Sequence, residues 1–292
     1  MRRGNSLESS AVTLPAPAKL NLFLHVTGRR QDGYHDIQTV FQLIDLADEL
    51  RFELIQSVEI FRAGDDYGVN ESDDLVFRAA KLLQMVTGTR QGARITVHKH
   101  IPVGAGLGGG SSDAATTLLA LNRLWNCQLS LIRLAQLGLE LGADVPVFIH
   151  GRSAFGSGIG EKLHYVNLGQ RHYVLVFNPY RISTAEVFNH AALPRGSVPI
   201  SLSEALAGAG RNDCEAVVSE LYPEFEQALA ELKKWGKPRM TGTGSCIFLA
   251  MPDKKAAINA AREIKCRYTV RAVRGLDVSP VHEMLGLAPG TG

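Results

Sequence analysis

A glycine-rich stretch is the part of this sequence whose residue types and spacing most directly suggest chemistry. It runs Ile101-Pro-Val-Gly-Ala-Gly-Leu-Gly-Gly-Gly-Ser-Ser-Asp113 and contains five glycines. Glycine lets backbone N–H groups turn toward one point and lets a ligand come close to the main chain. The helix that the next residues favour would add unpaired N–H groups and the positive end of its dipole. The stretch therefore predicts an anion site, with phosphate as the expected anion.

This stretch does not fit the better-known phosphate motifs. Residues 104–109 match a dinucleotide fingerprint, but the acidic residue and second strand that the fingerprint requires are missing from 123–128. The chain has no Gly-Lys-Ser/Thr for a Walker A loop, and no His-Arg-Asp or Asp-Phe-Gly for a protein kinase. Ser111 and Ser112 could cap the helix, contact phosphate or hold a metal ion. A purely structural glycine turn is the alternative for the whole loop.

Two charged residues in apolar surroundings are further candidates for chemistry. Lys19 shares one face of an alternating strand pattern with Asn21, where a lysine could close over a site or simply face solvent. Asp144 stands between the helix stop at Gly142 and Pro146, in an otherwise apolar turn. A buried carboxylate is costly unless it is paired. Asp144 therefore either caps the next helix or holds a partner for chemistry, and its position leaves both open.

An aromatic pair after a predicted turn is the last candidate. Asp32 and Gly33 give a turn signal between two strand patterns, and Tyr34 and His35 follow directly. Such a pair is often only surface. The functional alternative is an aromatic plate and a hydrogen-bonding ring for a planar ligand.

The elements that would position these residues follow from the periodicity of apolar residues. Asp73 and Asp74 could cap a helix that runs to about 86 and stops at Gly88. Pro179 marks the expected passage into a second domain. Strands are expected at 15–26, 37–44, 94–100, 172–178 and 268–273, with two shorter ones within 49–61 and a strand and turn at 151–160. Further helices are expected at 114–125, 131–141, 201–208, 212–221, 223–235 and 253–265.

Length and composition limit the function classes. At 292 residues the chain exceeds what a single core usually holds, so one large or two medium domains are expected. The 31 basic and 29 acidic residues give a net charge of +2, which argues against a dedicated nucleic-acid or membrane-surface protein. The four cysteines are far apart, so we expect reduced thiols and no metal knuckle. No apolar stretch fits a membrane span or a signal peptide, and we expect a cytoplasmic protein.

Five motifs that occur in order give a more specific resemblance. They are Pro15-x-Pro-Ala-Lys-Leu-Asn-Leu22, Gly33-Tyr-His35, the loop at 102–112, Gly142-Ala-Asp-Val-Pro146 and Met240-Thr-Gly-Thr-Gly-Ser-Cys246. The glycine loop by itself resembles the ATP loop of the GHMP kinases, which include galactokinase, homoserine kinase and mevalonate kinase. The whole set, which spans about 15 to 275, resembles the 4-diphosphocytidyl-2-C-methyl-D-erythritol kinase family within that superfamily.

The resemblance implies an α+β fold of the two-domain GHMP kinase type. It implies an N-terminal ribosomal-S5-like βαβ domain at 12–178, a C-terminal ferredoxin-like domain at 179–280, and an active site in the cleft between them. The implied reaction uses ATP and Mg²⁺ to phosphorylate the 2-hydroxyl group of 4-diphosphocytidyl-2-C-methyl-D-erythritol, in the non-mevalonate route to isoprenoids. Phosphoryl transfer needs positioning and charge neutralisation more than covalent help. We therefore expect direct in-line transfer without a phosphoenzyme.

The resemblance also implies roles for single residues. Asp144 would be the catalytic base and Lys19 its partner, with Asn21 supporting the pair. Mg²⁺ would be held by the ATP phosphates, with Ser112 as a candidate ligand. The expected ATP contacts are Asp74 and Lys99 at its adenosine part, together with Pro102, Val103, Gly104, Ala105, Gly106, Leu107, Gly108, Gly109, Gly110, Ser111 and Ser112. The expected substrate contacts are Tyr34, Phe41 and Phe188 around the cytosine, His35 on its polar edge, and Thr184.

Three other functions remain as alternatives. Another GHMP kinase would phosphorylate a small alcohol such as mevalonate or homoserine. A non-catalytic nucleotide- or RNA-binding module is the alternative outside enzymes, since the implied N-terminal fold is shared with RNA-binding proteins. A dinucleotide-binding oxidoreductase is the weakest of the three. The expected partner is a small molecule rather than a nucleic acid or a membrane, and a homodimer is left open.

Overall fold

A long antiparallel hairpin runs through the structure, a computed structural model that describes residues 11–66 and 68–288. β1 (Val12–Arg29) pairs with β2 (His35–Ile55) along almost its whole length. Gly33 supplies the left-handed conformation that the connecting turn requires. The strands expected at 15–26 and 37–44 are confirmed, and both are longer than predicted.

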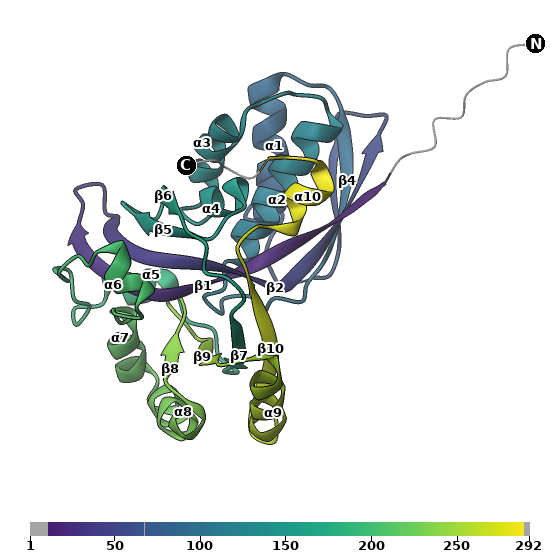
Figure 1. Ribbon diagram of the computed structural model, residues 1–292. Coiled ribbons are helices and arrows are strands. Elements are labelled where there is room, and N and C mark those ends of the chain that lie inside the picture. The colour runs from purple at the N-terminus through teal and green to yellow at the C-terminus, as the bar shows by residue number, and fades with distance from the viewer. Residues whose placement is uncertain (1–10, 67, 289–292) are drawn as a thin grey trace, which may run out of the picture.

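The N-terminal half builds a sheet around β2 and packs helices against it (Figure 1). β2 pairs with β4 (Gly92–His98), which runs parallel to β3 (Ile60–Gly64). Near the hairpin turn β2 also pairs with β5 (Ala154–Ser157), and β5 with β6 (Lys162–Tyr165). The helices are α1 (Leu75–Thr87), α2 (Gly109–Leu124), α3 (Leu131–Leu141) and α4 (Val145–His150). α2 contacts the other three helices as well as β1 and β2, so the glycine loop enters the middle of this layer.

Local sequence signals set the ends of α1. The carboxylate of Asp74 accepts a hydrogen bond from the N–H group of Val76 at 2.8 Å, and the chain leaves the helix through Gly88 in the left-handed conformation. Both ends agree with the prediction. The helices expected at 131–141 and 114–125 are also confirmed as α3 and as most of α2.

The C-terminal half is a four-stranded antiparallel sheet with helices against it. The strands lie in the order β10, β7, β9, β8, and the chain visits them as β7, β8, β9, β10 with helices in the two long connections. This is the predicted ferredoxin-like arrangement. The strands are β7 (His172–Phe177), β8 (Pro238–Met240), β9 (Ile247–Met251) and β10 (Thr269–Leu276). The helices are α5 (Thr184–Asn189), α6 (Leu202–Leu206), α7 (Cys214–Leu221), α8 (Pro223–Leu232), the 3₁₀ turn Lys233–Trp235 and α9 (Lys254–Ile264).

Strand pairing bears on the proposed division of the chain. β10 pairs with β7 along its length and with β2 at Gly275 and Leu276, which joins the two sheets edge to edge. β7 lies before the proposed boundary at 178/179, yet its hydrogen-bonded neighbours are β9 and β10. We therefore propose that the C-terminal domain begins at about His172, the first residue of β7.

A last helix, α10 (Pro280–Leu285), was not predicted from the sequence. It returns to the N-terminal half, where Val281 joins the core and a ring nitrogen of His282 lies 3.0 Å from the carbonyl oxygen of Ile149. The helix is only six residues long, so its apolar spacing gave too short a pattern to detect. In the described part of the chain, no helix has both the length and the apolar character needed to cross a membrane.

The buried ring of His282 predicts a loss of stability in mild acid. Burial lowers the pKa of His282, so near pH 6.5 and below the unfolded chain binds a proton that the folded chain does not. By linkage, the free energy of unfolding then falls as the pH falls from about 6.5 toward the lowered pKa. Replacement His282→Gln keeps a donor for the carbonyl oxygen of Ile149 but cannot titrate. The free energy of unfolding, measured with urea, should therefore decrease less between about pH 7.5 and about pH 5.5 than it does in the unmodified chain. The exposed His164 provides the control, and equal decreases in His282→Gln and His164→Gln would contradict the prediction.

Candidate active site

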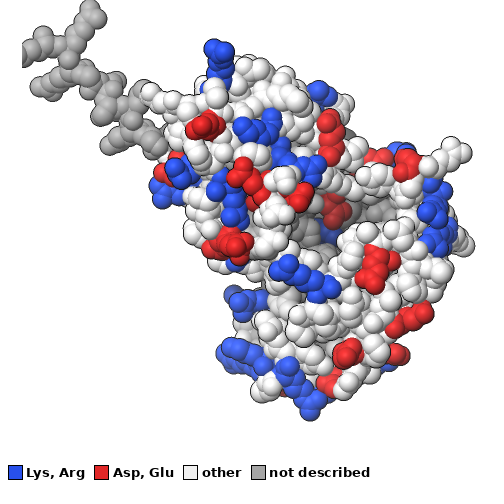
Figure 2. Space-filling view, turned by 180° about the vertical axis from the view of Figure 1, so that it is seen from behind, with Lys and Arg blue, Asp and Glu red and all other residues white. Residues whose placement is uncertain are grey.

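A cleft of about 510 Å³ lies where the two halves meet. Figure 2 shows it as a hollow with charged side chains at its bottom. β1, the glycine loop, the start of α4, α5 and the loop after β8 all contribute lining residues. The predicted site residues that line it are Lys19, Asn21, Asp74, Lys99, 102–110, Ser111, Asp144, Thr184 and Phe188. Residues as far apart in the sequence as Lys19 and Thr243 therefore meet in one cavity, as the cleft prediction requires.

The glycine loop has a repeating left-handed backbone. Gly104, Gly106 and Gly108 have φ angles of 74°, 75° and 73°, and α2 begins immediately afterwards. Among the described residues, no side chain caps the first turn of α2. Of the alternatives for Ser111 and Ser112, capping of this helix is therefore wrong. The open N–H groups and the helix dipole leave this turn suited to bind an anion.

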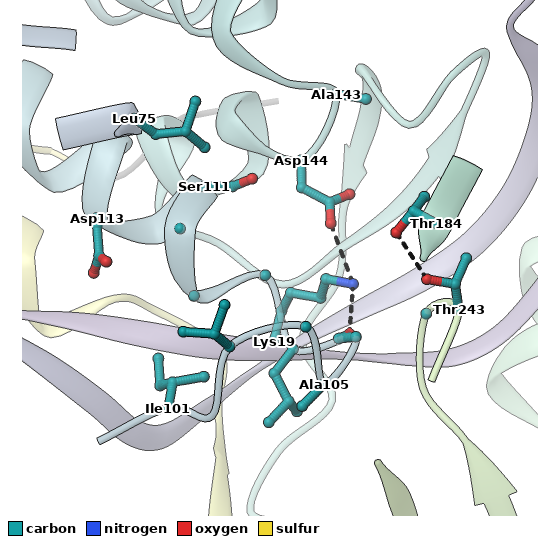
Figure 3. Close-up of a pocket in the computed structure, with 18 of the residues that line it drawn as sticks. Lys19, Leu75, Ile101, Ala105, Ser111, Asp113, Ala143, Asp144, Thr184 and Thr243 are labelled. Carbon is teal, nitrogen blue, oxygen red and sulfur yellow. Dashed lines mark hydrogen bonds and ion pairs between the residues drawn. The ribbon is translucent and has the colours of Figure 1, made fainter. Parts of the chain in front are cut away.

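The two serines face different surroundings. Ser111 lines the cleft, and Figure 3 shows its side chain between the glycine loop and Asp144. Ser112 is fully buried, and in the part of the chain that the structure describes its hydroxyl group has no hydrogen-bond partner. Ser112 does not reach the cleft, so the geometry gives no support to its predicted contact with a phosphate or a metal ion.

A second glycine loop packs against the first. A Cβ atom at Gly106 would lie 2.2 Å from the carbonyl oxygen of Thr241, so only glycine fits there. The hydroxyl group of Thr241 accepts a hydrogen bond from the backbone N–H group of Asn21 at 2.9 Å. Thr241 thus joins β1 to the glycine loop. The sequence had shown the glycines at 242 and 244, but it gave no indication that the two loops would touch.

Lys19 and Asp144 form an ion pair inside the cleft (Figure 3). The ammonium nitrogen of Lys19 lies 3.2 Å from Oδ2 of Asp144 and donates to the carbonyl oxygen of Gly106 at 3.1 Å. Its third partner is Oδ1 of Asn21 at 2.5 Å. The Lys19 side chain is only 3% exposed, so all three N–H groups are satisfied within the protein. The ammonium group is therefore held in one position.

The amide of Asn21 has a single consistent orientation. Its Nδ2 donates to the hydroxyl oxygen of Thr39 at 2.9 Å, and that hydroxyl group donates to the carbonyl oxygen of Phe23 at 2.5 Å. With Nδ2 engaged as a donor, Oδ1 must face Lys19 as an acceptor. This chain of donors fixes both Asn21 and, through it, Lys19.

Asp144 is the one member of the pair that reaches solvent. It stands at the start of α4 but, among the described residues, its side chain makes no capping hydrogen bond. The alternative that Asp144 caps this helix is therefore wrong, and the carboxylate instead holds Lys19. The side chain is 31% exposed, so the oxygen that does not face Lys19 is open to the cleft. A carboxylate held in this way can accept a proton from a hydroxyl group placed beside it.

A buried cluster of charges lies behind the glycine loop. Lys99 pairs with Asp48 and, at 2.7 Å, with Asp113. Asp48 also accepts the backbone N–H groups of His100 and Ile101, which anchors the start of the loop to β2. Burial raises the pKa of Asp113 to about 7, against the opposing effect of Lys99. Burial acts to lower the pKa of Lys99, but the two carboxylates outweigh it and raise that pKa.

Sequence reasoning missed Asp48, although an acidic residue within an apolar strand could have indicated it. Lys99 and Asp74 were both predicted to contact adenosine, and both line the cleft. The Asp74 carboxylate is also paired with Arg62 at 3.1 Å. The contact of Lys99 and Asp74 with adenosine stays a prediction.

The residues predicted to hold a nucleobase are only partly brought together. Thr184 and Phe188 line the cleft from α5, and the hydroxyl groups of Thr184 and Thr243 lie 3.0 Å apart. The ring of His35 packs against Phe188 with 5.2 Å between centroids. Tyr34 projects from the hairpin turn, 57% exposed, and lies outside the cleft lining.

Phe41 departs from its predicted role. It is fully buried, with the ammonium nitrogen of Lys19 5.8 Å from the centre of its ring. No face of this ring is open to stack on a base. The ring of Phe41 instead packs against Lys19, whose ammonium group lies over it in a cation–π contact.

Comparison with known proteins decides the family. Residues 74–152 match the family model of the GHMP kinases N terminal domain, and residues 192–270 match that of GHMP kinases C terminal. The chain is 48% identical over 274 residues to the 4-diphosphocytidyl-2-C-methyl-D-erythritol kinase of Pseudomonas entomophila (strain L48), covering 94% of this chain and 96% of that protein. The chain belongs to the 4-diphosphocytidyl-2-C-methyl-D-erythritol kinase family. A second member of this family, from Chromohalobacter salexigens, is 47% identical over 94% of this chain and 95% of its own.

Solved structures agree with this family and its fold. A crystal structure of 4-(cytidine 5'-diphospho)-2C-methyl-D-erythritol kinase matches with a TM-score of 0.78 at 35% identity, covering 90% of this chain and 99% of that one. The homoserine kinase of Cytophaga hutchinsonii matches with a TM-score of 0.68 at 16% identity, over 96% of this chain and 98% of that one, and so shares the fold alone. The predicted family and its two-domain GHMP kinase fold are confirmed.

Proposed function

We propose that this chain transfers the γ-phosphoryl group of ATP to the 2-hydroxyl group of 4-diphosphocytidyl-2-C-methyl-D-erythritol, a step of the non-mevalonate route to isoprenoids. The observation that carries this proposal is the Lys19–Asp144 pair, 3.2 Å apart, facing the same cleft as the first turn of α2. The relatives whose names state this activity supply the choice of substrate.

The reaction uses positioning and charge rather than a covalent intermediate. N–H groups of the glycine loop and of the first turn of α2 bind the ATP phosphates. The substrate oxygen attacks the γ-phosphorus while the bond to the bridging oxygen of ADP breaks, and the hydroxyl proton passes to the free oxygen of Asp144. Lys19 keeps Asp144 oriented and offsets negative charge at the transferring group. Because no protein group is phosphorylated, the configuration at a chiral γ-phosphorus is inverted.

Mg²⁺ would enter this cleft bound to the phosphates of the nucleotide. Among the described residues there is no group of three or more His, Cys, Asp or Glu side chains that could hold a metal ion by itself. Mg²⁺ is commonly bound through substrate phosphates and only one or two protein groups, and it would supply charge neutralisation there. Ser111 lines the cleft and Ser112 does not. We therefore assign the candidate protein ligand to Ser111 in place of Ser112.

The two ends of the cleft suggest where the two nucleosides bind. Figure 3 shows Leu75 and Asp113 on one side of the glycine loop, and Asp144, Thr184 and Thr243 on the other. Asp74 adjoins Leu75 and Lys99 pairs with Asp113, so we assign the adenosine to that side. The cytidine then lies near α5, where Phe188 lines the cleft and the ring of His35 packs against Phe188 from outside the cleft lining.

A coupled assay of ADP release with ATP and Mg²⁺ tests the substrate. We expect turnover with 4-diphosphocytidyl-2-C-methyl-D-erythritol and none with mevalonate or homoserine. Turnover of mevalonate or homoserine instead would favour another GHMP kinase activity, and turnover of none of them would refute the proposed function.

A further inference from the structure

Asn212 lies in the segment between α6 and α7, where the C-terminal half of the chain contacts β1. The backbone N–H group of Leu24 donates to the carbonyl oxygen of Arg211 at 3.0 Å, and the N–H group of Asp213 donates to the carbonyl oxygen of Leu24 at 2.8 Å. The two stretches run parallel at this point. The segment that bears Asn212 is therefore fixed to β1 shortly beyond Lys19.

The side chain of Asn212 holds the second glycine loop through two hydrogen bonds. Its Nδ2 donates to the carbonyl oxygens of Met240 at 3.0 Å and Gly242 at 2.8 Å. Its Oδ1 accepts the backbone N–H group of Cys214 at 3.0 Å, which leaves Nδ2 as the donor and fixes the orientation of the amide. The side chain is buried, so loss of Nδ2 would leave two buried carbonyl oxygens without this donor. These two carbonyl oxygens belong to the neighbours of Thr241, and Asn212 thus holds Thr241 from both sides.

Thr241 in turn contacts both Asn21 and Gly106, which fix the ammonium group of Lys19. Its hydroxyl group accepts the backbone N–H group of Asn21 at 2.9 Å and donates to the carbonyl oxygen of Gly106 at 3.4 Å. The side chain of Asn21 and that same carbonyl oxygen are two of the three partners of Lys19. A shift of Thr241 would therefore displace two acceptors of the ammonium group together.

We propose that Asn212 is a positioning residue for phosphoryl transfer, which holds Thr241 in place and, through Thr241, the ammonium group of Lys19. Asn212 lies outside the lining of the cleft, so it acts through residues that do reach the cleft. Because the rate depends steeply on the position of a reacting group, loss of this support should affect kcat more than KM. This inference rests on the proposed function, since it takes Lys19 to act on the transferring phosphoryl group.

The position of the ammonium group can be followed without any enzymatic assay. In protein labelled with ¹⁵N-lysine, the buried ammonium group of Lys19 should exchange slowly with water, and its signal is assigned by its loss in Lys19→Met. Asn212→Asp keeps the oxygen that accepts from Cys214 but lacks the two N–H donors. We expect this variant to broaden the signal of Lys19 and to leave that of Lys99, which pairs with carboxylates behind the first glycine loop. An unchanged Lys19 signal would overturn the inference whatever the substrate is.

Kinetics test the effect on the reaction. Asn212→Asp should lower kcat roughly ten-fold and change the KM values for ATP and for the cytidylyl substrate much less. Ile264→Ala is the matched control, because Ile264 is buried on α9 in the core of the same half and lies outside the cleft lining. This control should lower the urea concentration at the midpoint of unfolding and leave kcat unchanged. A kcat as low in Ile264→Ala as in Asn212→Asp would overturn the inference.

A double variant separates the path through Lys19 from general support of the fold. If Asn212 acts through Lys19, Asn212→Asp should lower the single-turnover rate much less in Lys19→Met than in the unmodified enzyme. Equal losses in the two backgrounds would overturn the inference and leave the proposed function intact.

Replacements of Thr241 test the same path without changing Asn212. Thr241→Val removes the hydroxyl group between Asn21 and Gly106 and should reproduce the loss of kcat, whereas Thr241→Ser keeps that hydroxyl group and should retain most of the rate. A normal kcat in Thr241→Val would also overturn the inference. If the unmodified enzyme does not turn over the cytidylyl substrate, the proposed function fails, and the ammonium signal of Lys19 still decides the role of Asn212.

Discussion

Replacement of Asp144 by asparagine is expected to lower kcat by about 10²–10⁴-fold, the usual loss on removal of a general base. Asparagine has nearly the same shape, but it cannot take the proton of the attacking hydroxyl group. Lys19 would keep its contacts with Asn21 and Gly106, so the cleft should retain its form. The KM for ATP should change little, because the phosphates are held by the glycine loop and α2. Steady-state kinetics and a single-turnover measurement of the chemical step check both expectations.

A matched control for this variant is available in the same cleft. Asp73 lines the cleft and is exposed, but it lies next to α1 on the side assigned to adenosine. Asp73→Asn should leave kcat close to that of the unmodified enzyme. If Asp144→Asn also keeps its kcat, Asp144 is not the base. If Lys19→Met and Asp144→Asn each lower kcat about as much as the double variant does, the two residues act as one unit.

The glycine loop and the ends of α1 could be predicted from the sequence because the residues that determine them are neighbours along the chain. The glycines at 104–110 and the helix after them are contiguous, and Asp74 with Gly88 marks the ends of α1 through side-chain and backbone preferences that need no tertiary contact. The strand pattern also placed Lys19 and Asn21 on one face, which is the face that meets Gly106.

Which of the candidate side chains reach the cleft, and which are buried, depended on contacts between segments that are distant in the sequence. Phe41 has the residue type of a base-stacking ring, but β5 pairs with β2 beside it and Lys19 lies over it, so it is buried. Ser112 and Ser111 differ by one position, and the 100° rotation per residue of α2 turns one inward and the other toward the cleft. His35 and Phe188 lie far apart in the sequence, and only the fold packs their two rings together. Patterns in one sequence give the candidate residues, and the tertiary structure decides which of them share a site.

Replacement of Gly106 by alanine should cause the second large loss of activity, because it displaces the glycine loop that binds the ATP phosphates. The new methyl group would lie 2.2 Å from the carbonyl oxygen of Thr241, a backbone atom that cannot rotate away. The loop must therefore shift, and with it the carbonyl oxygen of Gly106 that receives Lys19. Because a displacement of about 1 Å at a reacting group can cost about 10²-fold, we expect kcat/KM for ATP to fall by that order. Initial-rate kinetics over a range of ATP concentrations provide the measurement.

Alanine in a left-handed backbone conformation lowers the free energy of unfolding even where its side chain meets no other atom. Gly88→Ala measures this loss by itself. Gly88 has a φ of 68°, close to the 75° of Gly106, but no atom within 4 Å of its would-be Cβ. Gly88→Ala should thus lower the free energy of unfolding by roughly 1 kcal/mol and leave the ATP kinetics unchanged. Gly106→Ala should lose both stability and ATP turnover, because it adds the collision with Thr241 to the same backbone strain. If Gly106→Ala behaved like Gly88→Ala in both measurements, the contact between the two glycine loops would not be what positions the phosphates.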